Sequence, residues 1–170
     1  MATGKADIPR AHKAALGVLS ELGIERIPTP LNRIAKQLDI FVEYAPLEDA
    51  LSGMAMVKNG RKLVWVNSLH HPNRQRFTLA HEIGHHVLHA DKLAEAVHVD
   101  KNLLRRDALS SQGTATEEIE ANNFASELLM PEPKMQEILG SINLEDQSKV
   151  AELAARLKVS PAALQFRLLR

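Results

Sequence analysis

Apolar residues recur every three to four positions over long parts of this chain, which is the spacing of one face of an α-helix. Residues 8–22 show the pattern first, and Pro28 and Pro30 then open a second helix. The longest run of this kind is RQRFTLAHEIGHHVLHA, residues 74–90. Weaker or shorter helical patterns follow in residues 92–96, 116–130, 132–139, 145–157 and 161–168. The chain is therefore predicted to be largely helical.

Between the second and third helices the spacing of apolar residues shortens. Residues 40–46 predict one strand, and residues 52–57 and 62–67 predict two more. Asn59-Gly60 lies between the last two, and Asn-Gly between apolar runs is a strong signal for a hairpin. We expect an α+β fold in which a small antiparallel three-stranded sheet packs on helices. The edge of such a sheet can pair with an extended peptide, although the sheet can equally serve only to cover the core.

The longest helical run contains the pentapeptide HEIGH, residues 81–85. Positions i and i+4 of a helix lie one turn apart on one face, so the imidazoles of His81 and His85 can reach a single metal ion. Glu82 beside them can act as general base toward a water molecule at that ion. Gly84 costs about 1 kcal/mol relative to Ala in a helix interior, which suggests that another segment approaches the backbone there. This pattern predicts metal-dependent hydrolysis.

Two histidines do not complete a catalytic zinc site, which normally uses three protein ligands and one water molecule. His89 continues the i, i+4 series, but on a straight helix its Cα would lie about 12 Å from that of His81, too far for three rings to close on one ion. His86 should point away, because it is rotated by about 100° from His85. The third ligand must come from another segment.

The acidic helix that follows supplies the candidates for this ligand. It carries Glu117, Glu118 and Glu120, and Glu118 forms an i, i+4 pair with Asn122. The acid of that pair can bind the metal while Asn122 holds a ligand side chain in place from behind. Glu120 projects about 200° away from Glu118 around the helix. Acidic residues in a first helical turn also compensate the helix dipole, which accounts for one or two of the three.

The segment RQRFTLAHEIGHHVLH followed by EEIEANNFASELLMPEP resembles the ImmA/IrrE family of metallopeptidases. The resemblance runs from about residue 28 to the end of the chain and implies a gluzincin-type, zincin-like metallopeptidase core. It also implies a specific protein partner, commonly a DNA-binding repressor. By position, the resemblance implies metal ligands His81, His85 and Glu118 and the catalytic residue Glu82. Glu120 and Glu117 remain fallback third ligands, because a single sequence does not fix the register of the second motif.

The composition is ordinary for a globular protein and narrows the metal chemistry. Hydrophobic residues make up 45% and charged residues 25%, and the formal net charge of 0 argues against a polybasic nucleic-acid binder. The absence of cysteine excludes thiolate ligands, and two imidazoles with one carboxylate suit Zn²⁺, with Mn²⁺ or Fe²⁺ as alternatives. The first twenty residues contain no signal-peptide core, and no run approaches the roughly 20 apolar residues of a membrane span. We expect a cytoplasmic location.

The last forty residues predict a small helical appendage. The segment VAELAARLKVSPAALQFRLLR resembles a helix-turn-helix, with a turn at residues 158–159, Ser160 as the cap and Pro161 as the first residue of the second helix. Because that second helix is mostly apolar, it favours packing, or docking of a helix-turn-helix substrate, over direct DNA binding. We predict a zincin-like core in residues 1–130 and a helix-turn-helix-like segment in residues 131–170 packed on it.

These features together predict a zinc metalloendopeptidase that cleaves a specific intracellular protein, such as a helix-turn-helix repressor or an antitoxin-like regulator, in transcription or stress control. The alternative is a non-cleaving, metal-containing interaction module that controls a repressor or toxin partner. His98 follows the short helix at residues 92–96, in a stretch expected to be a mobile connection. It is a candidate contact for substrate or oxyanion, although an exposed histidine more often has no such role. The sequence does not determine the oligomeric state.

Overall fold

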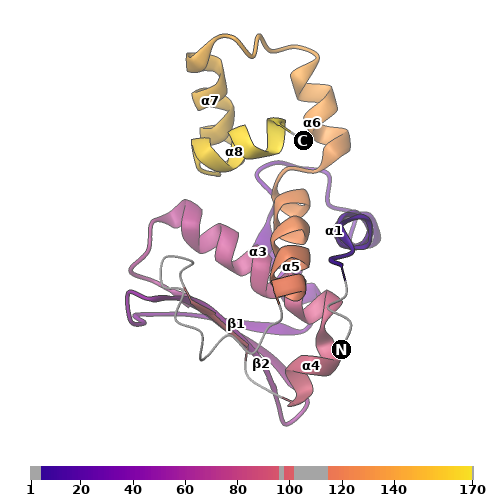
Figure 1. Ribbon diagram of the computed structural model, residues 1–170, viewed down its shortest axis with the longest axis vertical. Coiled ribbons are helices and arrows are strands. Elements are labelled where there is room, and N and C mark those ends of the chain that lie inside the picture. Colours follow the sequence, from indigo (N-terminus) through magenta and orange to yellow (C-terminus); the bar gives the residue numbers. More distant parts are fainter. Residues whose placement is uncertain (1–4, 96–97, 102–114, 170) are drawn as a thin grey trace.

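The computed structural model describes residues 5–95, 98–101 and 115–169, and it has the predicted α+β character (Figure 1). Among the described helices, none combines the length and apolarity needed to cross a bilayer. The elements, most of them within a few residues of their predicted bounds, are α1 (Ile8–Glu21), α2 (Leu31–Gln37), β1 (Ile40–Ala45), β2 (Leu51–Lys58), β3 (Arg61–Asn67), α3 (Pro72–Leu88), α4 (Ala90–Glu95), β4 (His98–Lys101), α5 (Ala115–Leu129), α6 (Glu132–Leu139), α7 (Gln147–Leu157) and α8 (Pro161–Leu168).

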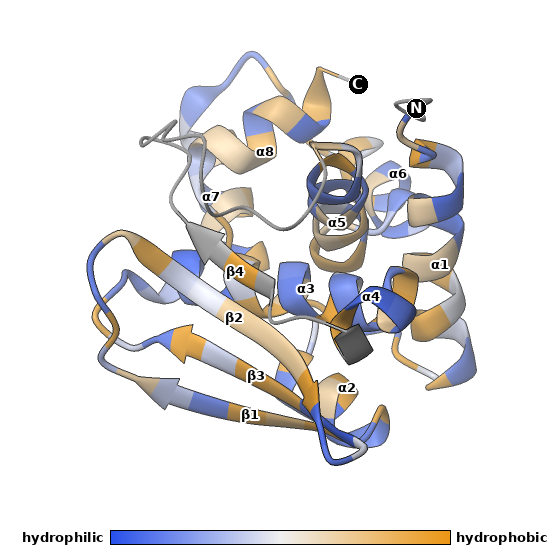
Figure 2. Cartoon of the chain, turned by 60° about the horizontal axis from the view of Figure 1, so that its bottom comes forward, coloured by the Kyte–Doolittle hydropathy of each residue, from blue (hydrophilic) through white to orange (hydrophobic). Residues whose placement is uncertain are grey.

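The sheet differs from the predicted one in size and in direction. It has four strands in the order β1-β3-β2-β4 (Figure 2). The β2–β3 hairpin is antiparallel as predicted, and Asn59 and Gly60 at its tip both have positive φ (51° and 75°), as a tight hairpin turn requires. However, β1 pairs with β3 in parallel, so the expected antiparallel sheet is wrong. The fourth strand, β4, lies in the stretch expected to be a mobile connection. The rest of that stretch, residues 96–97 and 102–113, lies outside the described residues.

The mixed pairing arises because the chain passes from β1 to the far side of β3 before β2 begins. Asn67, at the end of β3, is buried and holds this connection in place. Its amide oxygen accepts from the backbone N–H of Leu47 at 3.3 Å, and its amide nitrogen donates to the carbonyl of Leu51 at 2.8 Å. The buried Val64 and Val66 suit β3 to a central position. An apolar pattern specifies which face of a strand is buried but not which strand lies beside it.

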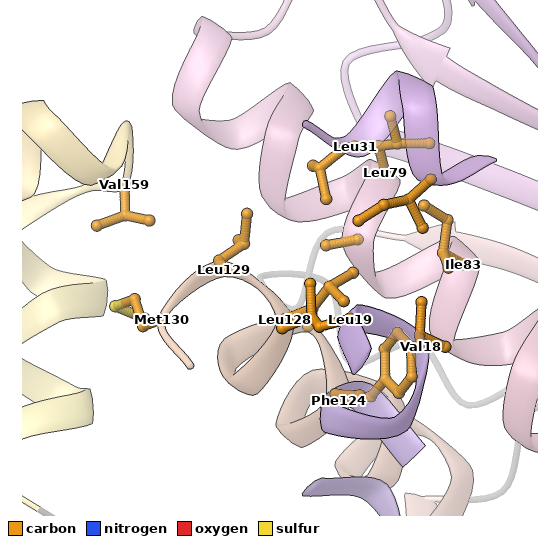
Figure 3. Packing of buried hydrophobic residues seen from close by; sticks show 14 of the residues in the cluster. Val18, Leu19, Leu31, Leu79, Ile83, Phe124, Leu128, Leu129, Met130 and Val159 are labelled. Atoms are coloured by element: carbon orange, nitrogen blue, oxygen red, sulfur yellow. The ribbon is translucent and has the colours of Figure 1, made fainter. Parts of the chain in front are cut away.

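Helix α3 lies over one face of the sheet and packs against α5 and α1, where the main hydrophobic core forms (Figure 3). The helix begins where the ring of His71 accepts the backbone N–H of Asn73 at 3.2 Å. Leu79 and Ile83 of α3 and Phe124 of α5 are buried in the same hydrophobic cluster. This packing fixes α3 and α5 against each other along much of their length.

Helices α3 and α5 approach each other closely at Gly84. A Cβ atom at Gly84 would lie 2.9 Å from a ring carbon of Phe124 and 3.4 Å from the carbonyl oxygen of Ala121. The close approach suggested by the glycine is therefore confirmed, and the neighbour is α5. Because the helices touch here, the first turns of α5 come beside the histidine pair of α3.

Helices α6, α7 and α8 lie together at one end of the molecule, beyond α5 (Figure 1). The predicted turn between α7 and α8 is present. Lys158 ends α7 in the left-handed conformation (φ 54°), and the hydroxyl of Ser160 caps α8 by accepting the N–H of Ala163 at 3.1 Å. This describes the local turn; the helix-turn-helix likeness of the segment stays a prediction.

A buried ion pair fastens α8 to the end of α5. The guanidinium of Arg167 donates to the carboxylate of Glu127 at 2.7 Å and to that of Glu132 at 2.9 Å. It also donates to the carbonyl of Met130 at 3.2 Å. The side chains of Arg167 and Glu127 are only 7% and 1% exposed. The predicted division of the chain after residue 130 stays a prediction, and Arg167 makes contacts on both sides of it.

Candidate metal centre

Three side chains from two helices converge at the junction of α3 and α5. The Nε2 atoms of His81 and His85 on α3 lie 3.0 Å apart, and each lies 3.4 Å from a carboxylate oxygen of Glu118 on α5. Both imidazoles are buried, whereas 30% of the Glu118 side chain is exposed. The group is thus held in the helix interface and opens toward solvent on the side of Glu118.

The spacing of these three atoms fits a divalent metal ion. Zinc binds nitrogen and oxygen at about 2.0–2.1 Å in a tetrahedron, which places neighbouring ligand atoms about 3.3 Å apart. The amide oxygen of Asn122 lies 3.0 Å from Nδ1 of His81, so that nitrogen carries the ring proton and Nε2 presents a lone pair. A lone pair that faces a carboxylate at 3.4 Å is stabilised by a cation between them. The residues present therefore fit the metal that the sequence predicts.

The electrostatics keep Glu118 in the form that binds metal. Burial alone raises the pKa of its carboxyl, but the imidazoles of His81 and His85, whose protonated forms attract the carboxylate, outweigh burial and hold the pKa well below its usual value. Glu118 is consequently ionised at neutral pH. A metal ligand of this type must be deprotonated.

The other predicted acids lie outside this group. Glu120 contacts the ring of His89, with Oε2 and Nε2 2.9 Å apart, and Glu117 forms an ion pair with Lys92 of α4. Neither fallback ligand is brought to the histidine pair, whereas Glu118 is. The backbone of His98 lies in β4, and the position of its side chain is outside what the structure describes. Its predicted contact with substrate stays a prediction.

The two remaining histidines of the run lie on different sides of α3. His86 points away from the ligand histidines, as predicted, and its Nε2 lies 3.1 Å from the carbonyl oxygen of Leu63 in the sheet; burial lowers its pKa. His89 packs behind His85, with their Nδ1 atoms 3.1 Å apart. Burial lowers the pKa of His89 more than its contact with Glu120 raises it. The sequence argument considered His89 only as a ligand and missed this contact, which its i, i+4 spacing from His85 signals.

Glu82 is fully buried between α3 and strand β2. Gly53 of β2 makes room for it, because a Cβ there would lie 2.5 Å from the methyl carbon of Thr78 and 3.3 Å from a carboxylate oxygen of Glu82. Gly53 was not predicted as part of the site, although a glycine inside a strand pattern is a recognised sign of close approach. The strand and the helix together fix the side chain of Glu82, the residue that follows His81 in the chain.

A histidine pair one helical turn apart, an adjacent glutamate and a carboxylate from a second helix are the parts of a metallopeptidase site. Comparison with known families agrees with this class. Residues 35–169 match the Peptidase_M78 family, the IrrE N-terminal-like domain, and the chain belongs to that family. The resemblance to ImmA/IrrE metallopeptidases is thereby confirmed.

Two known proteins show how far the similarity extends. The radiation response metalloprotease IrrE of Deinococcus radiodurans is 36% identical over 110 residues, which cover 62% of this chain and 30% of that protein. A solved structure described as a Mycobacterium tuberculosis transcriptional regulator has a TM-score of 0.62 and 18% identity, and the match covers 94% of this chain and 46% of that chain. The chain thus spans less than half the length of either protein. The first supports a metalloprotease role, and the second is a likeness of fold alone.

Proposed function

We propose that the chain is a zinc-dependent metalloendopeptidase that cleaves a peptide bond in one specific intracellular protein. The observation that carries this proposal is the convergence of His81, His85 and Glu118. The two histidines lie on α3, the helix that also carries Glu82, and Glu118 lies on the neighbouring helix α5. When bound, zinc lowers the pKa of a coordinated water to about 7 and polarises the carbonyl that is attacked. Two imidazoles and one carboxylate leave one of four coordination positions for that chemistry.

The residues of the chain divide the remaining work. His81, His85 and Glu118 hold the ion, and Asn122 fixes the ring of His81 through its contact with Nδ1. The carboxylate of Glu82 accepts a proton from the attacking water and passes it to the nitrogen of the leaving amine. Glu82 does so from a position fixed by α3 and β2, so little reorganisation accompanies the proton transfer.

The proposed substrate is a DNA-binding regulator of the helix-turn-helix or antitoxin-like kind, met in the cytoplasm. Family membership supports a metalloprotease. The words "radiation response" in the name of the similar Deinococcus radiodurans metalloprotease support regulated rather than general proteolysis. Direct DNA binding is not proposed, because the exposed residues of α8 include Gln165 and Phe166 but few side chains suited to reading base edges.

The decisive experiment compares the protein with its Glu82→Gln variant. Lysate of the native cell is incubated with each purified protein, and new protein N-termini are labelled and identified by mass spectrometry. We expect the parent to produce a small set of new protein N-termini. None of these termini should appear with Glu82→Gln, or with the parent after treatment with a chelator. Zinc content is measured for both proteins, and the variant should retain the ion because Glu82 is not one of the three converging ligands.

Three results would contradict the proposal in whole or in part. Equal cleavage by Glu82→Gln would remove the role of Glu82 as general base. A zinc-loaded parent that produces no new termini would favour the alternative, a metal-containing interaction module that controls its partner without cutting it. A third pattern, in which many unrelated proteins are cut, would keep the chemistry but overturn the narrow substrate range.

A further inference from the structure

A line of hydrogen-bonding groups runs from His85 through the helix interface to the first turn of α1. Nδ1 of His85 lies 3.1 Å from Nδ1 of His89, and Nε2 of His89 lies 2.9 Å from Oε2 of Glu120. The other oxygen of Glu120, Oε1, accepts the backbone N–H of Asp7 at 2.8 Å, and the guanidinium of Arg10 lies 3.6 Å from Oε2. The side chains of His89 and Glu120 are both buried.

The carboxylate of Glu120, at the end of this line, determines which ring nitrogen of each histidine carries a proton. A carboxylate can only accept, so the ring nitrogen of His89 that faces Glu120 must carry a proton. A neutral imidazole has one N–H and one lone pair, and Nδ1 of His89 is then an acceptor. It accepts from Nδ1–H of His85. The remaining nitrogen of His85, Nε2, therefore presents its lone pair to His81 and Glu118.

We propose that His89 and Glu120 are a positioning pair, which holds the ring of His85 in the orientation and tautomer that binds metal. The inference rests on the proposed function, since it concerns the same metal centre. It assigns a role to a histidine that cannot reach the ion and to an acid that lies outside the ligand group. It also gives the two ligand histidines separate supports, Asn122 for His81 and the His89–Glu120 pair for His85. Loss of a support of this kind typically lowers metal affinity about 10- to 100-fold.

The support reaches outside the two helices that carry the ligands. Arg10 of α1 approaches Glu120 and also donates to the carbonyl of Leu88 at 2.8 Å, at the end of α3. The backbone N–H of Asp7 binds one oxygen of Glu120 and so directs the other toward His89. Helix α1 thereby fixes the orientation of the carboxylate on which the whole arrangement of protons depends.

The first test reads the tautomer of His85 directly in the metal-free parent protein. Long-range ¹H–¹⁵N correlation spectra distinguish an imidazole protonated on Nδ1 from one protonated on Nε2. We expect His85 and His81 to be protonated on Nδ1, and His89 on Nε2. A His85 ring protonated on Nε2 would overturn the proposal, and this measurement needs no variant, no bound metal and no peptide cleavage.

The second test uses Glu120→Gln, which preserves the shape of the side chain, replaces one acceptor oxygen by an NH₂ donor and removes the charge that faces Arg10. The amide oxygen of the new side chain faces the N–H of Asp7, so its NH₂ group faces His89 and donates to it. His89 must then donate to His85, which forces the proton of His85 onto Nε2. We expect this tautomer in the metal-free variant, and zinc binding weakened about 10- to 100-fold in competition with a chelator.

Variants of His89 separate its two contacts. His89→Asn places an oxygen near the original Nδ1 and keeps an acceptor for His85, so zinc affinity should stay within about threefold of the parent. In His89→Gln the new side chain reaches toward Glu120 but leaves Nδ1 of His85 without its acceptor. The zinc affinity of this variant should fall about 10- to 100-fold. His86→Gln is the matched control, since its residue faces the carbonyl of Leu63 and not the ligand group.

Thermal unfolding of each metal-free variant shows whether it is folded before zinc is added. The proposal is wrong if Glu120→Gln and His89→Gln bind zinc as tightly as His86→Gln, or if His89→Asn loses as much affinity as His89→Gln. Failure of the proposed function has a different signature. Tautomers and zinc affinities as expected, with no cleavage of any protein, would leave the positioning pair intact and remove the peptidase assignment.

Discussion

The contact between Gly84 and Phe124 sets how closely α3 and α5 can approach, and Gly84→Ala tests it. The added methyl group would lie 2.9 Å from Cδ1 and 3.3 Å from Cγ of Phe124. Phe124 is completely buried in the core, where side chains are closely packed. The helices must therefore move apart by a few tenths of an ångström or the ring must leave its preferred rotamer. Either change acts on the helix that carries Glu118.

Two opposing contributions determine the effect on stability. Replacing Gly by Ala in a helix interior favours folding by about 1 kcal/mol. Forcing a methyl group into a packed core costs about 1–3 kcal/mol. The expected net result is a loss of about 0–2 kcal/mol in the free energy of unfolding. Gly17→Ala in α1 is the matched control, because a Cβ there meets nothing within 4 Å. That variant should gain about 1 kcal/mol, so the two should differ by about 1–3 kcal/mol.

The assay is urea unfolding of the metal-free proteins, followed by circular dichroism, together with zinc affinity by chelator competition. Gly84→Ala should bind zinc more weakly than the parent, because Glu118 moves relative to the histidine pair, whereas Gly17→Ala should bind it equally well. If Gly84→Ala is stabilised as much as Gly17→Ala and binds zinc like the parent, the contact with Phe124 does not set the helix spacing.

Two further predictions concern groups away from the ligands. Burial lowers the pKa of His86 below its ordinary value of 6.5, so the unfolded chain takes up the proton first as the pH falls. The contribution of His86 to stability is then complete above about pH 6.5 and is lost as the pH falls through the folded pKa. Metal-free His86→Gln should therefore lose less stability than the parent between about pH 7 and pH 5, as measured by urea unfolding. An identical loss in the two proteins would contradict this. Arg167→Met leaves the carboxylate of Glu127, 1% exposed, without its guanidinium and should cost about 3–5 kcal/mol in unfolding free energy. Adding Glu127→Gln to that variant should recover most of the loss, and no recovery would mean that packing rather than charge is responsible.

Local signals predicted much of the fold. Helical spacing found α1, α2, α3 and α5, and Asn59-Gly60 found the β2–β3 hairpin, because these patterns act over neighbouring residues. The order of strands depends on where the chain goes between β1 and β2, and on the buried Asn67 that holds this connection. Apolar spacing carries no information about such a path. The parallel pairing of β1 and the presence of β4 were missed for that reason.

The site was predictable to a similar depth. His81, Glu82 and His85 share one helical turn, so spacing alone brings the two imidazoles together. The convergence of Glu118 with them, in place of Glu117 or Glu120, depends on how α5 turns against α3, which no single-sequence pattern specifies. The resemblance to a family indicated Glu118, and the geometry brings that residue to the histidine pair.

Helix α1 changes what should be regarded as the smallest functional unit of this chain. The family match begins at residue 35, beyond the end of α1 at Glu21. Yet α1 contributes Ala15 and Leu19 to the core and anchors Glu120 through Asp7. A protein trimmed to the matched region would expose apolar surface on α5 and release the carboxylate that orients His89. Sequence similarity thus marks out a shorter segment than the one that sustains the metal site.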